Sequence, residues 1–417
     1  MANAEQTLVG NSNASWQQKL CRTIMLKVFA SLPQGQLVVK EKGVLVETFG
    51  HKDSDLHAEI DFLSISVYQR LLFGGSVASG ETYSEGLWTT PNLTNVIRIF
   101  ARNLPVLDNW ESKMEWLAFP IRKIKHLANK NSTQGAKKNI AAHYDLGNKL
   151  YTRFLDDSMM YSAAIYPTKD TTLAEAQNIK LKAICDKLQL VPEDHLIEIG
   201  TGWGGLAVFA AKHYGCRVTT TTISEEQYQY AQDLVVKEGL QDKITLLKKD
   251  YRLLEGKFDK LVSIEMIEAV GKEYLPTFFE KCSSLLKDQG LMVLQAITIS
   301  DHRFDSYSKS VDFIQKHIFP GGFLPSQLLI NQHLRKHTNL MIRDLHDIGL
   351  DYAQTLRDWH HKLLENKEHL AKDGYDQRFM NMWRYYFSYC EGGFLERTIS
   401  TVQLVISKPE FSRAIIR

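Results

Sequence analysis

From residue 141 onward, short apolar segments alternate with longer amphipathic ones, and this alternation most constrains the fold. A capping box at Thr172 and Glu175 opens one amphipathic segment, which carries an apolar stripe that includes Leu181 and Ile184. Strands that alternate with helices form parallel sheets covered on both faces. The sequence therefore predicts an α/β, Rossmann-like fold with a seven-stranded, mostly parallel sheet, whose strands are HLIEIG, RVTTTTIS, ITLLKKDY, FDKLVSIEM, GLMVLQAITIS, LMIRDLHDI and TVQLVIS.

The chain before this alternation has a different pattern. Residues 1–15 are polar and are expected to be flexible. Residues 16–128 combine a helix-like run with short strand-like pieces (QLVVKEKG, VLVETFG, AEIDFLSISV) and predict a small α+β domain. The segment from Lys113 to Lys138 is basic and ends in helix breakers, which is typical of a solvated linker, expected over residues 129–140, or of a patch for an anionic membrane surface. The domain after this linker spans residues 141–417.

Composition excludes several classes of protein. The 417 residues are 44% apolar and 24% charged, with a net charge of +2, as in ordinary globular proteins. The chain lacks a long apolar run or a signal pattern at its start, which favours a cytoplasmic protein that meets a membrane only peripherally. The five scattered cysteines and the histidines 360, 361 and 369 have no metal-ligand spacing, so we expect no metal. The balanced charge disfavours nucleic acid as a partner.

A glycine-rich segment, Glu198-Ile-Gly-Thr-Gly-Trp-Gly-Gly205, follows the first strand of the alternation and opens a helix. Glycines at such a place allow a tight turn and close approach to a ligand, and the helix start offers free N–H groups. A dinucleotide is disfavoured because the second strand ends in Thr219–Thr222 rather than in an acid. A carboxylate at Glu198 suits the cationic amino group of S-adenosylmethionine (SAM).

Two further segments bear on the cofactor. Asp250 closes the third strand, where its carboxylate is suited to accept from an adenine amino group, and Tyr251 is suited to stack on the ring. Ser224 and Gln227 fit either a contact to the cofactor or a capping box behind an apolar residue.

Seven motifs in order carry a family resemblance: HYDLGN (143–148), MMYSAA (159–164), EIGTGWGG, TISEEQ (222–227), KDYR (249–252), EMIEAVG (265–271) and IFPGGFLPS (318–326). On these residues the chain resembles the cyclopropane-fatty-acyl-phospholipid synthases, and it is also similar to the mycolic acid cyclopropane synthases. The resemblance implies a class I SAM-dependent methyltransferase with a helical insertion between strands five and six that covers the acyl chain. Residues 16–127 look like the N-terminal, lipid-associated domain of longer members.

Members of this family transfer the methyl group of SAM to a cis double bond in a phospholipid acyl chain. The resemblance implies a bicarbonate ion that acts as the base, held by Ala163, Glu268, Ile297 and Tyr352, and it implies catalytic roles for Glu268, Tyr352, Cys390 and Gln295. It implies as partners an unsaturated phospholipid and the inner membrane surface, with a homodimer left open. The implied cofactor-binding residues are Tyr161, Ser162, Glu198, Gly200, Thr201, Gly202, Gly204, Thr222, Ser224, Gln227, Asp250 and Tyr251.

The chain departs from the family pattern at two places. Ala163 stands where the family has Cys, and Gln295 stands where a His is common. Ala163 keeps its main-chain N–H, and the Gln295 amide can donate a hydrogen bond but cannot carry a proton. The alternatives are therefore a cyclopropane product, a methyl-branched or methylene lipid, methylation of another small molecule, or, as a different class, a non-catalytic SAM- or lipid-binding protein.

The expected chemistry needs a dry site, a cation-stabilising surface and a base. An alkene must be held near the sulfonium methyl, the resulting carbocation is stabilised by aromatic faces, and a base then removes a proton. Glu268 is expected to orient a bicarbonate ion or to take the proton itself, and the spacing of Glu265 and Glu268 also fits one carboxylate that caps or salt-bridges a helix. The candidate aromatic residues are Tyr307, Phe313, Phe319, Phe323, Trp383, Tyr385, Tyr386, Phe387 and Tyr389.

Overall fold

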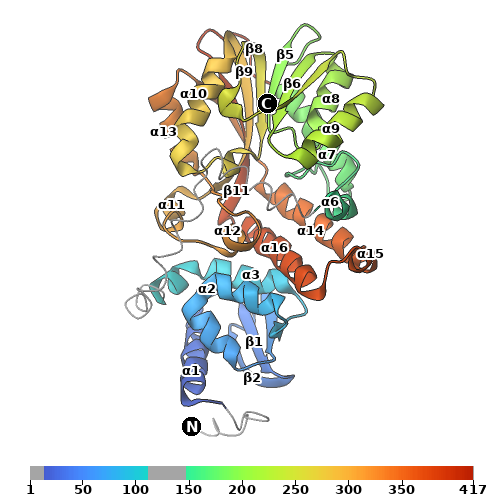
Figure 1. The fold of residues 1–417 in the computed structure, drawn as a ribbon. Helices are drawn as coiled ribbons and strands as arrows, with labels where there is room; N and C mark the ends of the chain where they lie inside the picture. The colour runs from blue at the N-terminus through green and yellow to red at the C-terminus, as the bar shows by residue number, and fades with distance from the viewer. Residues whose placement is uncertain (1–13, 111–146, 417) are drawn as a thin grey trace. The chain divides into compact units, whose positions relative to one another are not determined.

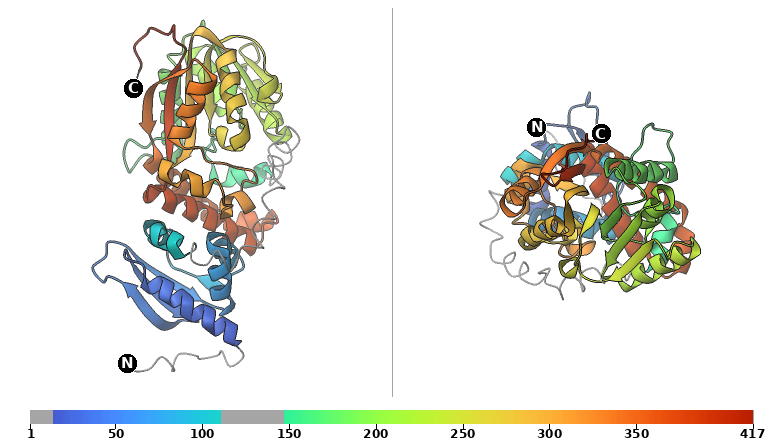
Figure 2. Two further views of the ribbon diagram at one scale, coloured as in Figure 1. Left: turned by 90° about the vertical axis from the view of Figure 1, so that its left-hand side faces the viewer. Right: turned by 90° about the horizontal axis from the view of Figure 1, so that it is seen from above.

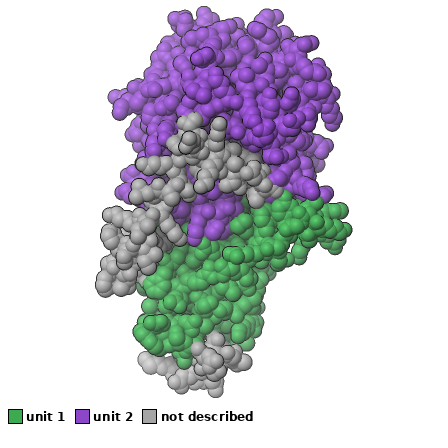
Figure 3. Space-filling model, viewed as in Figure 1, with its two compact units in different colours: residues 1–127, 367–396 green, residues 128–366, 397–417 purple. Residues whose placement is uncertain are grey.

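The computed structural model describes residues 14–110 and 147–416, which form two compact units (Figure 3). Unit 1 comprises residues 1–127 and 367–396, and unit 2 comprises residues 128–366 and 397–417. The expected linker at 129–140, nearly all of the expected flexible start, and the first four residues of HYDLGN lie outside the described residues.

Unit 1 contains a small α+β arrangement, in the part of the chain where residues 16–128 are expected to form such a domain, together with residues 367–396. Its four strands form one sheet in the order β2-β1-β3-β4: β1 (Gln36–Glu41), β2 (Val44–Gly50), β3 (His57–Phe62) and β4 (Trp88–Thr89). Burial alternates along β3, and the side chains of Ala58, Ile60 and Phe62 are the buried ones. Three helices accompany this sheet: α1 (Trp16–Ala30), α2 (Ser66–Ser84) and α3 (Leu93–Arg102).

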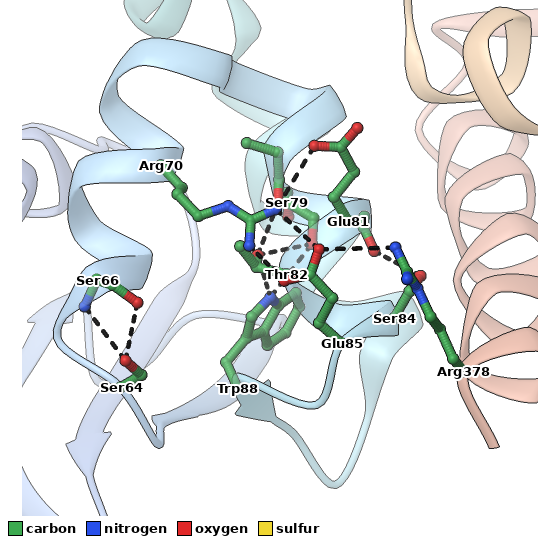
Figure 4. A network of polar contacts seen from close by, with 12 residues as sticks. Ser64, Ser66, Arg70, Ser79, Glu81, Thr82, Ser84, Glu85, Trp88 and Arg378 are labelled. Carbon is green, nitrogen blue, oxygen red and sulfur yellow. Dashed lines mark hydrogen bonds and ion pairs between the residues drawn. The ribbon is translucent and has the colours of Figure 1, made fainter.

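Two late helices, α15 (Lys367–Lys372) and α16 (Gln377–Leu395), also belong to unit 1. The Glu396 carboxylate, which follows α16, accepts from Nε of Arg98 and Nε of Arg102, each at 2.6 Å. Figure 4 shows Arg378 of α16 beside Glu85 at the end of α2. The structure therefore differs from the expected continuous domain 141–417, because apolar and charged contacts place residues 367–396 with the N-terminal elements.

The sheet of unit 2 has seven strands in the order β10-β11-β9-β8-β5-β6-β7. Strand β11 is antiparallel to both of its neighbours, and the strands β9, β8, β5, β6 and β7 run parallel to one another. The sheet is therefore mostly parallel, as the sequence predicts. All seven predicted strands are confirmed: β5 (His195–Ile199), β6 (Arg217–Thr222), β7 (Ile244–Lys248), β8 (Phe258–Ile264), β9 (Leu286–Ile299), β10 (Met341–Asp347) and β11 (Ile399–Ser407).

Helices cover both faces of this sheet because successive strand residues point to opposite sides. Leu196 belongs to the core under α7 (Leu173–Lys187), α8 (Gly205–Tyr214) and α9 (Glu225–Lys237). Ile197 belongs to the core under α10 (Leu275–Leu285) and α13 (Gln327–His337). Figure 1 shows these two helical layers, and the left-hand view of Figure 2 looks onto the face with the yellow α10 and the orange α13.

The predicted helical insertion between strands five and six is present between β9 and β10. It contains η4 (Asp301–Arg303), α11 (Phe304–Tyr307), α12 (Phe313–His317) and α13, and it carries IFPGGFLPS between α12 and α13. Three short 3-10 helices, η1 (Tyr251–Leu253), η2 (Ile267–Ala269) and η3 (Lys272–Tyr274), follow β7 and β8. Two more helices, α6 (Asn148–Phe154) and α14 (Gly349–Glu365), complete the described part of unit 2. Of the helices in the described ranges, none has the length and apolarity needed to cross a membrane.

Candidate active site

The glycine-rich segment joins β5 to α8 at the carboxyl edge of the sheet. Gly200 has φ +102°, which glycine adopts without strain, and its N–H and that of Thr201 donate to the Thr221 carbonyl at 3.2 and 3.0 Å. A Cβ on Gly205 would lie 2.5 Å from the Ser158 carbonyl oxygen, so glycine alone fits there. The loop thus brings the start of α8, with its free N–H groups, against the segment that carries Tyr161 and Ser162.

Glu198 lies inside β5, just before this loop, and its side chain is buried. It accepts a hydrogen bond from Thr220 Oγ1 at 2.6 Å, and Thr220 Oγ1 lies 2.7 Å from Thr201 Oγ1. Burial raises the pKa of Glu198 to about 8, while the Thr220 bond and the charge of Lys180 oppose this rise. A cation placed beside such a carboxylate stabilises its ionised form. The SAM ammonium group is a cation of this kind, so the residues present fit the cofactor.

Helix α7 supports the segment 160–163 through two buried polar side chains. Lys180 Nζ donates to Ser162 Oγ at 3.0 Å, and Gln177 Nε2 donates to the Ser162 carbonyl at 3.0 Å. Burial lowers the pKa of Lys180 to about 8, whereas the nearby charges of Glu265, Asp156 and Glu198 raise it. The sequence reasoning missed Lys180. The sequence feature that could have indicated this residue is the position of a lysine next to Leu181, on the apolar stripe of α7.

The ends of β6 and β7 hold the remaining predicted cofactor residues. Ser224 accepts from the Gln227 N–H at 3.3 Å and caps α9, and Thr222 Oγ1 donates to Gln227 Oε1 at 2.9 Å. Ser224 is therefore the N-cap of α9, but the predicted capping box is only half formed, because the Ser224 N–H donates to Thr222 Oγ1 and not to the Gln227 side chain. The Asp250 carboxylate is held by Arg252, with Nε 2.9 Å from Oδ1 and Nη2 2.6 Å from Oδ2. The contacts of these side chains to a cofactor stay predictions.

Glu265 follows β8 and is the acceptor of a three-donor cluster. Its Oε1 accepts from the Ala163 N–H at 2.9 Å and from Gln295 Nε2 at 2.8 Å, and its Oε2 accepts from the Tyr352 hydroxyl at 2.9 Å. Burial raises the pKa of Glu265, and the three hydrogen bonds and the charge of Lys180 act in the opposite direction. Glu265 is therefore not the helix cap that its spacing from Glu268 suggested, because the chain turns between the two residues.

Glu268, in η2, has fewer partners. Its Oε1 accepts from the Ile297 N–H at 2.5 Å, and its Oε2 is buried without a hydrogen-bond partner among the described residues. Burial and the charge of Glu265 raise the pKa of Glu268 to about 8. Its backbone carbonyl accepts from the Phe323 N–H at 2.8 Å, which ties η2 to IFPGGFLPS. The site thus contains two neighbouring carboxyl groups with unequal numbers of donors.

These contacts test whether a bicarbonate ion fits. Of its four predicted holders, Ala163 and Tyr352 donate to Glu265, Ile297 donates to Glu268, and the fourth holder is Glu268 itself. An added anion would find these donors engaged and would face two carboxyl groups, which like-charge repulsion opposes. The residues present therefore do not fit bicarbonate.

A buried polar chain leads from Glu265 across the sheet. Gln295 on β9 and Gln403 on β11 are paired in register, and Gln403 Nε2 donates to Gln295 Oε1 at 2.9 Å. Gln403 Oε1 accepts from Lys187 Nζ at 2.6 Å. A lysine only donates, so the Gln403 oxygen must face it. Each amide is then fixed in turn, and Gln295 Nε2 is directed at Glu265.

Aromatic rings surround Tyr161 and extend toward Glu265. The Tyr161 ring centroid lies 5.2 Å from that of Trp359, 5.3 Å from Tyr151 and 6.2 Å from Phe319. The Tyr352 ring stands edge-on to Trp359 at 6.0 Å. We call Tyr151, Tyr161, Phe319, Tyr352 and Trp359 the aromatic cluster. Such faces can stabilise a developing cation and exclude water.

The structure brings three of the predicted catalytic residues together in unit 2. Gln295 contacts Glu265, as does Tyr352, and Glu268 is the electrostatic neighbour of Glu265. Of the predicted aromatic residues, Phe319 belongs to the aromatic cluster, whereas those numbered 383 to 389 lie on α16 in unit 1. Cys390 also lies on α16, and its catalytic role stays a prediction.

The sheet order, the glycine loop before α8 and the buried Glu198 define a class I SAM-dependent methyltransferase. A family model described as mycolic acid cyclopropane synthetase matches residues 131–404. The chain belongs to this family, which confirms the resemblance.

Individual relatives agree with this assignment. The chain is 37% identical to the cyclopropane-fatty-acyl-phospholipid synthase of Escherichia coli, over 84% of this chain and 88% of the relative. It is 36% identical to the tuberculostearic acid methyltransferase UfaA1 of Mycobacterium tuberculosis, over 77% and 76%. The structure of the mycolic acid cyclopropane synthase CmaA1 in complex with SAH and CTAB has a TM-score of 0.61 at 28% identity and covers 65% of this chain and 98% of its own.

Proposed function

We propose that the protein transfers the methyl group of SAM to the cis double bond of an unsaturated phospholipid acyl chain and forms a cyclopropane ring. The observation that carries this proposal is the pair Glu265 and Glu268 beside the aromatic cluster, in the unit that also holds the cofactor loop. The similarity to the Escherichia coli synthase over most of both chains supports the same substrate class.

Each part of the site has a task in this reaction. Bound SAM supplies an electrophilic methyl group, and Glu198 together with the start of α8 is suited to hold its charged end. The aromatic cluster keeps water from the carbocation and offers it π faces. A carboxylate at the end of β8 then takes a proton from the new methyl group, so that the ring closes. An isolated alkene is a weak nucleophile, so alignment in this dry space supplies much of the rate.

The substrate places the reaction at a bilayer, because acyl chains of phospholipids reside there. We propose a peripheral contact with the membrane through the insertion between β9 and β10. Val311 and Leu328 of this insertion are large apolar side chains exposed to solvent, 39% and 54% respectively. Exposed apolar side chains gain free energy when they enter the membrane interface.

The test is incubation of the full chain with SAM and vesicles of dioleoylphosphatidylglycerol, followed by mass spectrometry and proton NMR of the acyl chains. A gain of one CH2 unit with upfield ring protons is expected. Vesicles of the saturated distearoyl lipid are the matched control and should gain nothing. Bound SAM without any gain in mass on unsaturated lipid would refute the proposed substrate.

A second product class stays in view because Gln295 replaces the common His and because several relatives are named methyltransferases rather than cyclopropane synthases. These include a probable fatty acid methyltransferase of Pseudomonas putida at 36% identity. A weaker base would leave the carbocation time for a hydride shift, and loss of a proton from the shifted cation then gives a methylene lipid or a methyl-branched lipid that keeps a double bond. The same NMR spectrum separates these outcomes, since the added mass then comes without ring protons.

A further inference from the structure

Glu265 combines a strained backbone with a fully engaged side chain. Its φ is +49°, in the left-handed region that residues with a Cβ rarely adopt. Its carboxylate nevertheless accepts from three donors, on the segment before α7, on β9 and on α14. Strain of this kind persists only where the surroundings fix it, and such sites are often functional. The strained backbone of Glu265 therefore indicates a functional role for the carboxylate that it positions.

The donor set is built around an anion. The Ala163 N–H and the Tyr352 hydroxyl donate to Glu265, and the Gln295 amide is turned toward it by Gln403 and Lys187. A carboxylate and a bicarbonate ion share the same planar O–C–O group, so a donor set that suits one suits the other. The side chain of Glu265 occupies two of the donors that the family resemblance assigns to bicarbonate, the Ala163 N–H and the Tyr352 hydroxyl, and a third, the Ile297 N–H, donates to Glu268.

We propose that Glu265 is the general base of this reaction and supplies from the chain the carboxylate that bicarbonate supplies in the family, so that turnover requires no dissolved anion. The inference rests on the proposed function. The choice between the two carboxyl groups follows from their donors. Glu265 has three donors that stabilise its charge, whereas Glu268 has, among the described residues, the Ile297 N–H alone from another part of the chain and lies beside the charge of Glu265.

The ring-closing step balances in protons and electrons. After methyl transfer, one C–H bond of the new methyl group breaks, and its proton goes to the Glu265 carboxylate. The electron pair of that bond forms the second carbon–carbon bond of the ring and cancels the positive charge on the substrate. The proton then passes to solvent. Overall, SAM and the alkene give the cyclopropane, S-adenosylhomocysteine and one proton, and bicarbonate has no part in the balance.

The first arm of the test measures turnover on dioleoylphosphatidylglycerol vesicles, in argon-purged buffer without carbon dioxide and in the same buffer with added bicarbonate. The wild type should turn over equally in both, within about twofold. Glu265→Gly should lose at least about a hundredfold without bicarbonate and recover when it is added. Glycine suits the positive φ, so this variant removes the side chain without adding strain. Glu273→Gln, at an exposed carboxylate nearby, is the matched control and should behave as the wild type.

The second arm measures binding of 13C-bicarbonate by NMR, which needs no lipid substrate. The wild type should not bind the ion, and Glu265→Gly should bind it at one site. Wild-type turnover that disappears without bicarbonate, or bicarbonate binding to the wild type, would overturn the inference. A wild type that alkylates no lipid in either buffer refutes the proposed function instead, and the NMR arm still decides whether Glu265 occupies the anion site.

Discussion

At the residue scale, the site depends on buried polar groups whose orientation is set by their neighbours. Glu265, Gln295, Gln403 and Lys187 form one directional series that begins at a lysine, which only donates, and ends at a carboxylate, which only accepts. A fully satisfied buried network specifies one arrangement, and a broken one leaves costly unpaired groups. The two glutamines, although uncharged, therefore direct the Gln295 Nε2 donor, and not the Gln295 oxygen, toward the Glu265 carboxylate.

We predict that Gln403→Leu lowers turnover about tenfold without changing SAM affinity. Without the Gln403 amide, Gln295 Oε1 loses its donor, and the Gln295 amide is held only through Nε2, by Glu265 and the Ala163 carbonyl, so Glu265 has a less firmly placed donor. Loss of a donor to an ionised carboxylate raises its pKa. The acid limb of the pH profile of kcat/KM should therefore move to higher pH, which a merely destabilised fold would not cause. Lys187→Met should shift the limb in the same direction and by less.

The raised pKa of Glu268 predicts how stability depends on pH. Its carboxyl titrates near pH 8 in the folded protein and near pH 4.5 when unfolded, so the folded state binds more protons in this interval. The free energy of unfolding should thus fall as pH rises from about 4.5 to about 8. Glu268→Gln removes this contribution. Urea unfolding of cofactor-free protein should show a decline between pH 5 and pH 8 that is about 1–2 kcal/mol smaller in the variant, after allowance for partial solvent access. Equal declines in both proteins would contradict the assignment.

At the element scale, the regular parts of unit 2 are the ones that the sequence predicts. All seven strands were predicted because each is an apolar segment bounded by charge or glycine, and α7 because its cap and stripe agree. The turn after β8 was not predicted. A spacing of three residues suggests one helix face, but Glu265 adopts a positive φ before η2, and its partners come from residues about 30 to 100 positions away in the chain. Local pattern carries no information about such distant donors.

The cap of α7 gives a prediction at this scale. Thr172 accepts from the Glu175 N–H, and the Glu175 carboxylate accepts from the Thr172 N–H, so both members of the capping box are formed. Thr172→Ala should lower the free energy of unfolding by about 1 kcal/mol, measured by urea denaturation. Thr152→Ala, at an exposed position inside α6, makes the same chemical change without a cap and should cost clearly less. Equal losses would show that the cap contributes nothing.

At the scale of the whole molecule, the sequence predicts two domains but not which residues complete each one. The amphipathic pattern of α16 indicates that one face is buried, yet it does not identify the surface that covers that face. In the structure, Tyr385 of α16 contacts Tyr83, and Glu391 accepts from Thr94. These contacts are separated by about 300 residues in sequence, and that distance is why a boundary drawn from composition alone left α16 with unit 2.

The ion pairs after α16 predict how unit 1 responds to mutation. Glu396 pairs with Arg98 and Arg102, and its side chain is only 9% exposed. Glu396→Ala leaves two partly buried guanidinium groups without this partner, and we expect a loss of about 1–3 kcal/mol in the unfolding of unit 1. Differential scanning calorimetry should show the transition of unit 1 at lower temperature. Glu368→Ala, at an exposed position on α15, is the control and should leave the transition in place.

The discontinuity of unit 1 has a consequence for biosynthesis. Its first 127 residues leave the ribosome early, but α16 follows only after most of unit 2 has been made, which at ordinary elongation rates is a delay on the order of tens of seconds. Strand β11, which lies between β9 and β10, emerges later still. Each unit is thus completed by a segment that is made much later than its first elements, and its apolar surface stays uncovered until then. Nascent chains of this protein should therefore depend on chaperones until α16 and β11 have been made.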